Sequence, residues 1–243
     1  MARFFLSPDA WGEHAALTGD EAKHAAQVMR VRRGDRITVF DGAGRSAVAE
    51  VEDVSKSEIR LKLGEVVQRP VPRPAIHLVQ AVPKGKTMDL IVQKAVELGV
   101  ASIQPVISRR TVVQVGEEDA ERKAAKWQRV ALEACKQCGQ DLLPVVKPPL
   151  GFDSWLGGAG KGAKLVASLY PGARPLKEVL REWGTPEDVT LLVGPEGDFT
   201  AEELEAAVAA GFEAASLGSI ILRAETAVFF VISAVRYEFF ASN

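Results

Sequence analysis

The sequence predicts a two-part α/β protein, with a small β-barrel domain in residues 1–70 and a larger α/β domain in residues 71–243. Two observations support this prediction. Prolines alternate at Pro70, Pro72 and Pro74, which favours an extended, semi-rigid spacer between domains. After this spacer, apolar segments alternate with helical ones, a pattern typical of a mostly parallel sheet that helices cover on both faces.

The front part has the pattern of a small barrel. A helical segment runs to Met29, and residues 37–40 and 46–51 have strand character on either side of Asp41-Gly42. Such a pair of strands around Asp-Gly predicts a hairpin. Further strand-like sequence follows to residue 63, and a run of short strands with one helix suggests a barrel.

The rear part alternates predicted strands and helices. Strands are expected at residues 75–82, 101–107, 164–169 and 189–193, and helices at 87–98, 121–138, 176–183, 200–210 and 227–240. Thr200 and Glu203 have the spacing of a capping box at a helix start. The last helix is apolar nearly all round, which indicates deep burial or a subunit interface.

Composition limits the function classes. No apolar run approaches the roughly 20 residues of a membrane-spanning helix, and the start lacks the features of a signal peptide, so we expect a cytoplasmic protein. Cys135 and Cys138 are i, i+3 neighbours that fit reduced thiols, and because the three histidines lie far off we predict no metal site. The formal charge is −2, so binding of nucleic acid would depend on local basic patches.

Two basic segments are candidates for such patches. Arg30, Arg32, Arg33 and Arg36 gather beside the hairpin with only Asp35 opposing, and they could bind phosphates; a solvated turn is the alternative. Lys84 begins a Lys-Gly-Lys-Thr stretch that resembles the end of a phosphate loop. Because Gln80 stands where the first glycine of that motif should be, we favour contact with RNA backbone, or a basic loop that caps a helix.

Residues 191–200, with the sequence LLVGPEGDFT, form the first candidate ligand loop. A buried strand here breaks into a Gly/Pro loop that leads to a capped helix. Such a loop, at the carboxyl end of a parallel strand, is where α/β sheets bind ligands, and Gly194 and Gly197 would let a ligand approach bare backbone. A plain strand-to-helix turn is the alternative.

Residues 216–227 form a second passage from strand to loop to helix, in which Arg223 and Glu225 interrupt apolar sequence. Charged residues in such surroundings are rarely buried without partners. They could therefore belong to a functional site, or form a structural pair that orients the last helix.

Together the two passages resemble the signature of the ribosomal-RNA small-subunit methyltransferase E family, within the knotted SPOUT superfamily. The family pattern is close to GPEGGF followed some twenty residues later by LGxRILRxETA. The matching residues are Gly194-Pro195-Glu196-Gly197, Phe199, Leu217-Gly218, Ile221-Leu222-Arg223 and Glu225-Thr226-Ala227. The resemblance extends over the whole chain.

This resemblance implies an RNA-binding PUA-like barrel in front of a trefoil-knotted methyltransferase domain that works as a homodimer. It implies methyl transfer from S-adenosylmethionine to N3 of one uridine in the decoding region of 16S rRNA, within the small ribosomal subunit. The implied catalytic residues are Arg223 and Glu225. The implied cofactor-binding residues are Leu192, Val193, Gly194, Pro195, Glu196, Gly197, Leu217, Gly218, Ile221, Leu222 and Thr226, and the RNA-binding candidates are Arg30, Arg32, Arg33, Lys84, Arg109 and Arg110.

The chain departs from the family pattern at three positions. Asp198 replaces a usual glycine, and Ile220 and Gln140 each replace a usual arginine. If those arginines bind RNA phosphate, RNA binding is weaker here unless Arg109 and Arg110 compensate. Two alternatives therefore stay open: a knotted methyltransferase that acts on a different RNA nucleotide, and a cofactor-binding but inactive RNA-binding or assembly module.

Overall fold

A computed structural model describes residues 1–55, 57–112, 116–160 and 162–240. The chain forms two compact units. Unit 1 comprises Met1–Val71 with Leu132–Leu143, and unit 2 comprises Pro72–Ala131 with Pro144–Asn243. The proline-rich spacer thus lies at the main division. The second segment of unit 1 comes from the middle of the chain, which a single boundary near residue 70 does not anticipate.

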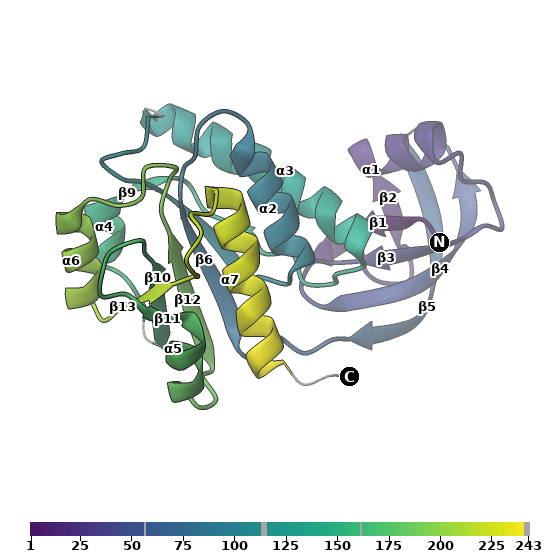
Figure 1. Ribbon diagram of the computed structural model, residues 1–243. Coiled ribbons are helices and arrows are strands. Elements are labelled where there is room, and N and C mark those ends of the chain that lie inside the picture. Colours follow the sequence, from purple (N-terminus) through teal and green to yellow (C-terminus); the bar gives the residue numbers. More distant parts are fainter. Residues whose placement is uncertain (56, 113–115, 161, 241–243) are drawn as a thin grey trace. The chain divides into compact units, whose positions relative to one another are not determined.

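Unit 1 is built on a five-stranded sheet in the order β1-β3-β4-β5-β2 (Figure 1). β3 and β4 pair antiparallel, which confirms the predicted hairpin. Among the strand pairs described in this sheet, β1 and β3 run parallel and the others antiparallel. The strands are β1 (Arg3–Phe5), β2 (Ala16–Thr18), β3 (Arg36–Phe40), β4 (Arg45–Val54) and β5 (Glu58–Gln68), and the helical segments are η1 (Pro8–Ala10), α1 (Gly19–Lys23) and the π-helix η2 (His24–Val28).

Asp41 shapes the turn between β3 and β4. Its buried carboxylate accepts hydrogen bonds from the backbone amides of Ala43 and Arg45, at 2.7 and 2.9 Å, and from Arg45 Nε at 2.6 Å. Burial alone would raise the pKa of Asp41, but the hydrogen bonds from the Arg45 side chain and the two amides hold that pKa below its ordinary value. The Asp41 side chain thus provides hydrogen-bond acceptors for backbone amides of the turn, which explains why Asp-Gly predicts a turn here.

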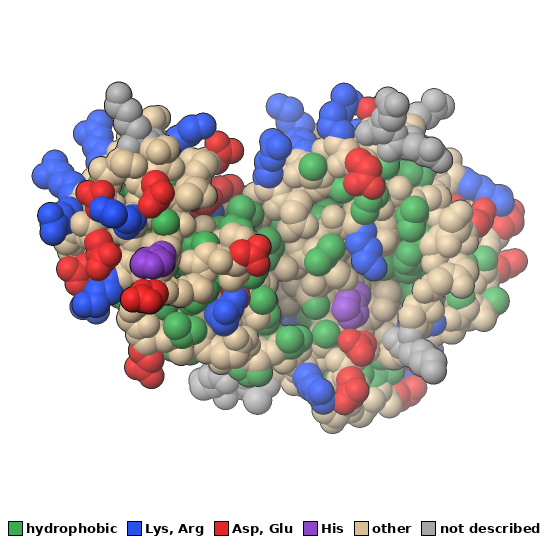
Figure 2. Space-filling view, turned by 180° about the vertical axis from the view of Figure 1, so that it is seen from behind, with side chains coloured by type: hydrophobic (Ala, Val, Ile, Leu, Met, Phe, Trp, Pro, Cys, Tyr) green, Lys and Arg blue, Asp and Glu red, His purple; other side chains and the backbone are tan. Residues whose placement is uncertain are grey.

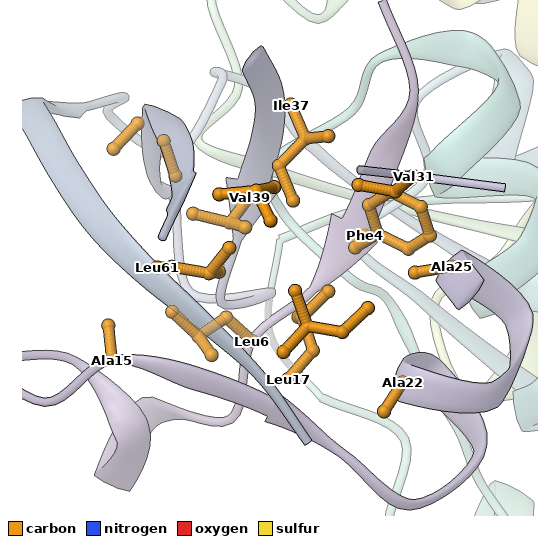
Figure 3. Packing of buried hydrophobic residues seen from close by; sticks show 14 residues of the cluster. Phe4, Leu6, Ala15, Leu17, Ala22, Ala25, Val31, Ile37, Val39 and Leu61 are labelled. Atoms are coloured by element: carbon orange, nitrogen blue, oxygen red, sulfur yellow. The ribbon is translucent and has the colours of Figure 1, made fainter. Parts of the chain in front are cut away.

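The core of unit 1 lies between the sheet and the short helices. Phe4, Leu6, Leu17, Val39 and Leu61 are each at most 2 % exposed and point toward one another (Figure 3). Small residues of the helical segments, Ala22 and Ala25, close the same cluster. Alternation of buried and exposed residues along β4 agrees with a sheet that has one face on this core.

Asp141 attaches the segment Leu132–Leu143 to the rest of unit 1. Its side chain is 1 % exposed and contacts the guanidinium groups of Arg3 and Arg69, the latter at 2.7 Å, while Ser46 Oγ donates to it at 2.9 Å. Its backbone carbonyl accepts from the Gly44 amide. A buried carboxylate with several charged donors is stabilised only while those partners remain.

Asp141→Asn is expected to lower the free energy of unfolding by about 2–3 kcal/mol, because it removes the negative charge opposite a largely buried Arg3. Asp53→Asn is the matched control, since the Asp53–Arg60 pair is exposed and should contribute less than about 1 kcal/mol. Chemical denaturation of the three proteins measures the difference. Equal losses in both variants would contradict the role assigned to Asp141.

The two cysteines are free, as expected, and differ in exposure: Cys135 is buried and Cys138 is exposed. Burial raises the pKa of the Cys135 thiol to about 12. At pH 8 a thiol reagent is therefore expected to label Cys138 alone until denaturant is added, as mass spectrometry of the labelled protein would reveal.

Above pH 9 the unfolded chain releases the Cys135 proton, whereas the folded chain retains it. The free energy of unfolding of the wild type should therefore fall more steeply with rising pH than that of Cys135→Ala.

Unit 2 contains a parallel eight-stranded sheet among its described residues, in the order β11-β13-β10-β12-β6-β7-β8, with β9 beside β7. This confirms the predicted parallel α/β architecture. The strands are β6 (Ala75–Ala81), β7 (Ser102–Ile107), β8 (Val145–Val146), β9 (Leu150–Gly151), β10 (Ala163–Ala167), β11 (Arg174–Pro175), β12 (Asp188–Val193) and β13 (Glu213–Ser216).

Helices flank this sheet, and α7 lies beside α2 and against β12 (Figure 1). α7 starts three residues earlier than expected, so Glu225 falls in its first turn, where an acidic side chain suits the helix dipole. The helices are α2 (Thr87–Glu97), α3 (Glu117–Cys138), α4 (Phe152–Leu156), α5 (Leu176–Glu182), α6 (Ala201–Ala209) and α7 (Ala224–Phe239), and α3 from Leu132 on belongs to unit 1. In the described ranges, none is long and apolar enough to cross a membrane.

Candidate functional site

Three loops at the carboxyl ends of neighbouring strands line one pocket in unit 2. β10 lies between β12 and β13 in the sheet, so the loops that follow these strands meet at the same edge. The lining residues are Ala167 at the end of β10 with Ser168 and Leu169 after it; Val193 at the end of β12 with Gly194, Pro195, Glu196 and Asp198 after it; Leu217, Gly218, Ile220, Ile221 and Leu222 after β13; and Ala224 and Ala227 of α7.

The loop after β12 folds back on itself at Gly194. A Cβ at this glycine would lie 3.0 Å from Asp198 Oδ1 and 3.1 Å from Asp198 Cα, closer than protein packing normally allows. Gln80, which is fully buried on β6, donates from Nε2 to the Gly194 carbonyl at 3.1 Å. A side chain at position 194 would therefore crowd the loop itself, in addition to any ligand that approaches it.

Asp198 connects two of the three loops. Its backbone has a φ of +59°, a left-handed conformation that glycine adopts freely and aspartate tolerates, which explains the usual glycine here. Its Oδ1 accepts from the Phe199 amide at 2.8 Å, and its Oδ2 accepts from the Leu169 amide at 3.2 Å. The sequence marked Asp198 only as a departure from the family pattern, whereas the structure places it in the pocket.

The loop after β13 is more exposed. Gly218 has a φ of +126°, which strongly favours glycine, and the Ser216 hydroxyl donates to its carbonyl. Ile220 and Ile221 are 77 % and 78 % exposed, although both line the pocket. Large apolar side chains this exposed suggest a surface that something covers.

Eight of the eleven expected cofactor-binding residues line this pocket, namely Val193, Gly194, Pro195, Glu196, Leu217, Gly218, Ile221 and Leu222. The structure places the other three outside the lining. Leu192 packs into the core of unit 2, the Gly197 carbonyl faces Arg110, and Thr226 is exposed on α7. The sequence did not indicate Ala167, Ser168 or Leu169, because nothing in it sets β10 between β12 and β13.

Arg223 and Glu225 flank the pocket-lining residue Ala224. Arg223 is exposed at the N-cap position of α7, and Glu225 is half-buried in the first turn. No ion pair joins the two within the part of the chain that the structure describes. Neither residue lines the pocket itself, although their chain neighbours Leu222 and Ala224 do.

Lys84, Arg109 and Arg110 lie on the loops after β6 and β7, the next two strands beyond β12. The Lys84 amide donates to Glu196 Oε1 at 2.9 Å. The residue is exposed, and the described contacts include none of its ammonium group. The Arg109 amide donates to Glu203, and Arg110 donates to the carbonyl of Gly197 at 2.6 Å. These hydrogen bonds tie the basic loops to the pocket loop.

Glu203 stabilises both the start of α6 and the loop after β7. It is 3 % exposed and completes the capping box with Thr200 that the sequence predicted at the start of α6. Its Oε2 accepts from the Thr200 amide at 3.0 Å and its Oε1 from the Arg109 amide at 2.8 Å. One buried carboxylate thus holds both the helix start and the neighbouring basic loop.

The other basic candidates belong to unit 1. Arg30, Arg32, Arg33 and Arg36 are all exposed, and the described residues give them no ion pair. Asp35 accepts from the backbone amide of Arg32 at 2.7 Å instead of pairing with a guanidinium group. On the face of the molecule drawn in Figure 2, basic and acidic side chains are mixed.

Comparisons with known proteins agree on one kind of protein. A family model described as an RNA methyltransferase domain matches residues 70–236, and one described as an RNA methyltransferase PUA domain matches residues 17–64. The ribosomal RNA small subunit methyltransferase E of Aquifex aeolicus is 32 % identical, over 94 % of this chain and 96 % of that protein.

Solved structures extend the likeness to the whole fold. The ribosomal RNA small subunit methyltransferase E of Neisseria gonorrhoeae, bound to S-adenosylmethionine, has a TM-score of 0.88 and 33 % identity, with 98 % of each chain covered. A Legionella pneumophila protein in complex with the same cofactor has a TM-score of 0.84 and 30 % identity, over 98 % of this chain and 97 % of that one.

Proposed function

Because the chain belongs to the ribosomal RNA small subunit methyltransferase E family, we propose that it methylates N3 of one uridine in the decoding region of 16S rRNA, within the small subunit. The methyl donor is S-adenosylmethionine. The observation that carries this proposal is the pocket that the loops after β10, β12 and β13 line together. Action on ribosomal subunits would place the protein in the cytoplasm.

The residues of the pocket suit S-adenosylmethionine. Apolar side chains such as Leu217, Ile221 and Leu222 offer walls for an adenine ring, and the glycines 194 and 218 expose backbone groups for hydrogen bonds. Two carboxylates, Glu196 and Asp198, match a ligand that carries positive charge. The bound cofactor would supply a methyl group on its sulfonium, and the neutral thioether that remains is a good leaving group. The protein therefore mainly has to align the acceptor.

Arg223 and Glu225 act on the uridine as the catalytic residues. N3 carries an imide proton, and its removal leaves negative charge on the uracil ring. Glu225 takes this proton or orients the guanidinium group, and Arg223 stabilises the charge on the uracil carbonyl. The target base has to leave its stack to reach them. Both positions border the pocket through Leu222 and Ala224, which supports this assignment.

Binding of the RNA uses two sets of cations. Lys84, Arg109 and Arg110 border the pocket loop of unit 2 through hydrogen bonds, and they contact phosphates beside the target uridine. Arg30, Arg32 and Arg33 of unit 1 bind phosphates elsewhere on the subunit. Where the family pattern has arginines at positions 140 and 220, this chain has Gln140 and Ile220, so Arg109 and Arg110 carry more of the phosphate contacts.

The functional unit is a homodimer, and the chain of unit 2 is knotted. Ile220, Ile221, Phe230 and Tyr237 are exposed on the loop after β13 and on α7, and a second copy would cover them. The return of α7 to the centre of the sheet, against β12 and α2, supports a threaded terminus. Analytical ultracentrifugation tests the dimer, and an experimental backbone trace tests the knot.

The deciding experiment incubates the purified protein and labelled S-adenosylmethionine with small subunits that lack the modification, and then maps the label by mass spectrometry. Label at N3 of a single 16S uridine is expected. Label on another nucleotide or on transfer RNA would identify a different RNA substrate. Binding of cofactor and subunit without any methyl transfer would favour an inactive assembly module. This alternative is considered because Gln140 and Ile220 replace arginines of the family pattern.

A further inference from the structure

The Asp198 carboxylate lies at the wall of the pocket and has no cationic partner among the described contacts. The residue is half-buried and lines the pocket. Both of its hydrogen bonds come from main-chain amides, those of Phe199 and Leu169, and an amide carries no net charge. No lysine or arginine forms an ion pair with it among the described contacts. The hydrogen bonds therefore fix the carboxylate in place without neutralising it.

The rest of the lining adds to this charge. Glu196 is the other charged residue in the lining, and no lysine or arginine belongs to the described lining. Arg110 lies outside the lining, but its guanidinium group donates to the carbonyls of Gly197 and Phe199, on either side of Asp198, so its positive charge offsets part of this negative charge. Among the residues that line the pocket, negative charge is therefore in excess, and in a partly desolvated setting charge acts more strongly than in water.

This charge distinguishes two ligands of nearly the same shape. S-adenosylmethionine has a positive sulfonium, whereas S-adenosylhomocysteine, which remains after the methyl group has left, has a neutral thioether in its place. Their ammonium, carboxylate and adenosine groups are the same. A negative wall stabilises the first relative to the second, because only the first carries the additional positive charge.

We propose that Asp198 is a specificity-determining residue, whose carboxylate makes the pocket bind S-adenosylmethionine more tightly than S-adenosylhomocysteine and so favours release of the spent cofactor. This inference rests on the proposed function, since it assumes the same pocket and the same cofactor. It adds a role for a position at which the chain departs from the family pattern.

The test measures the dissociation constants of both ligands by calorimetry for the wild type, Asp198→Asn and Asp198→Gly. Asparagine and glycine both tolerate a φ of +59°, so neither strains the turn. Loss of the charge is expected to weaken S-adenosylmethionine about five- to tenfold and S-adenosylhomocysteine less than about twofold. Disturbance of the loop alone would weaken the two ligands in parallel, so the ratio of the two constants isolates the charge.

Asp188→Asn is the matched control, because Asp188 begins β12 at the opposite end of the strand and pairs with His77. It should leave the ratio unchanged. If both Asp198 variants keep the wild-type ratio while the wild type binds both ligands, the charge role is wrong and the proposed function stands. If the wild type binds no S-adenosylmethionine, the proposed function fails first.

Discussion

Gly194→Val is expected to abolish detectable binding of S-adenosylmethionine, with a loss of affinity greater than about 100-fold. A Cβ at this position would lie 3.0–3.1 Å from Asp198, and valine adds two further methyl groups in the same space. The loop would have to open, which displaces Pro195 and Glu196 from the pocket wall. Gly194→Ala should have a smaller effect of the same sign. Calorimetry measures both.

Gly160→Val is the control for this prediction. No heavy atom lies within 4 Å of a Cβ built at Gly160, and its backbone is outside the left-handed region, so valine is accommodated there. Circular dichroism establishes whether each variant is folded. A folded Gly194→Val protein with wild-type affinity would show that the loop after β12 is not part of the cofactor site.

The reason for Gly194 illustrates what the sequence can and cannot predict. The strand, Gly/Pro loop and capped helix around it are local features, and local patterns predicted them together with the capping box of Thr200 and Glu203. The close approach of Asp198 depends on how the loop folds back. A glycine that the sequence explains by ligand access also avoids a close contact within its own loop.

Longer-range features were not accessible in the same way. The insertion of β10 between β12 and β13 brings Ser168 and Leu169 to the pocket, and this order depends on contacts between strands far apart in the chain. The attachment of Leu132–Leu143 to unit 1 depends likewise on Asp141, whose charged partners come from residues more than sixty positions away. No periodicity or spacing reports such pairings.

The charged residues of the site also differ in whether the sequence or the structure indicates their roles. The interruption of apolar sequence drew attention to Arg223 and Glu225, but their functional roles came from the family resemblance, and the structure leaves both beside the pocket. The role of Asp198, in contrast, follows from the structure. Its backbone conformation and its two amide donors give it a physical role that the family pattern, with glycine at this position, does not supply.

Arg223→Ala is expected to lower the rate of methyl transfer at saturating substrates about 10²- to 10³-fold, because it removes a cation that stabilises developing charge. The affinity for S-adenosylmethionine should change less than about threefold, since the Arg223 side chain is outside the pocket lining. Arg223→Lys keeps the charge without the forked geometry and should be intermediate. Single-turnover kinetics on small subunits, beside calorimetry of the cofactor, separate the two effects.

The pH dependence distinguishes charge stabilisation from a structural role at the start of α7. Without Arg223, the uridine anion forms less readily, so the rate of the Ala variant should rise more steeply with pH than that of the wild type. Arg73→Ala is the control, because Arg73 forms an exposed pair with Glu187 beside the amino ends of β6 and β12, at the opposite edge of the sheet. A uniform loss at every pH, accompanied by weaker cofactor binding, would instead assign Arg223 to the shape of the pocket.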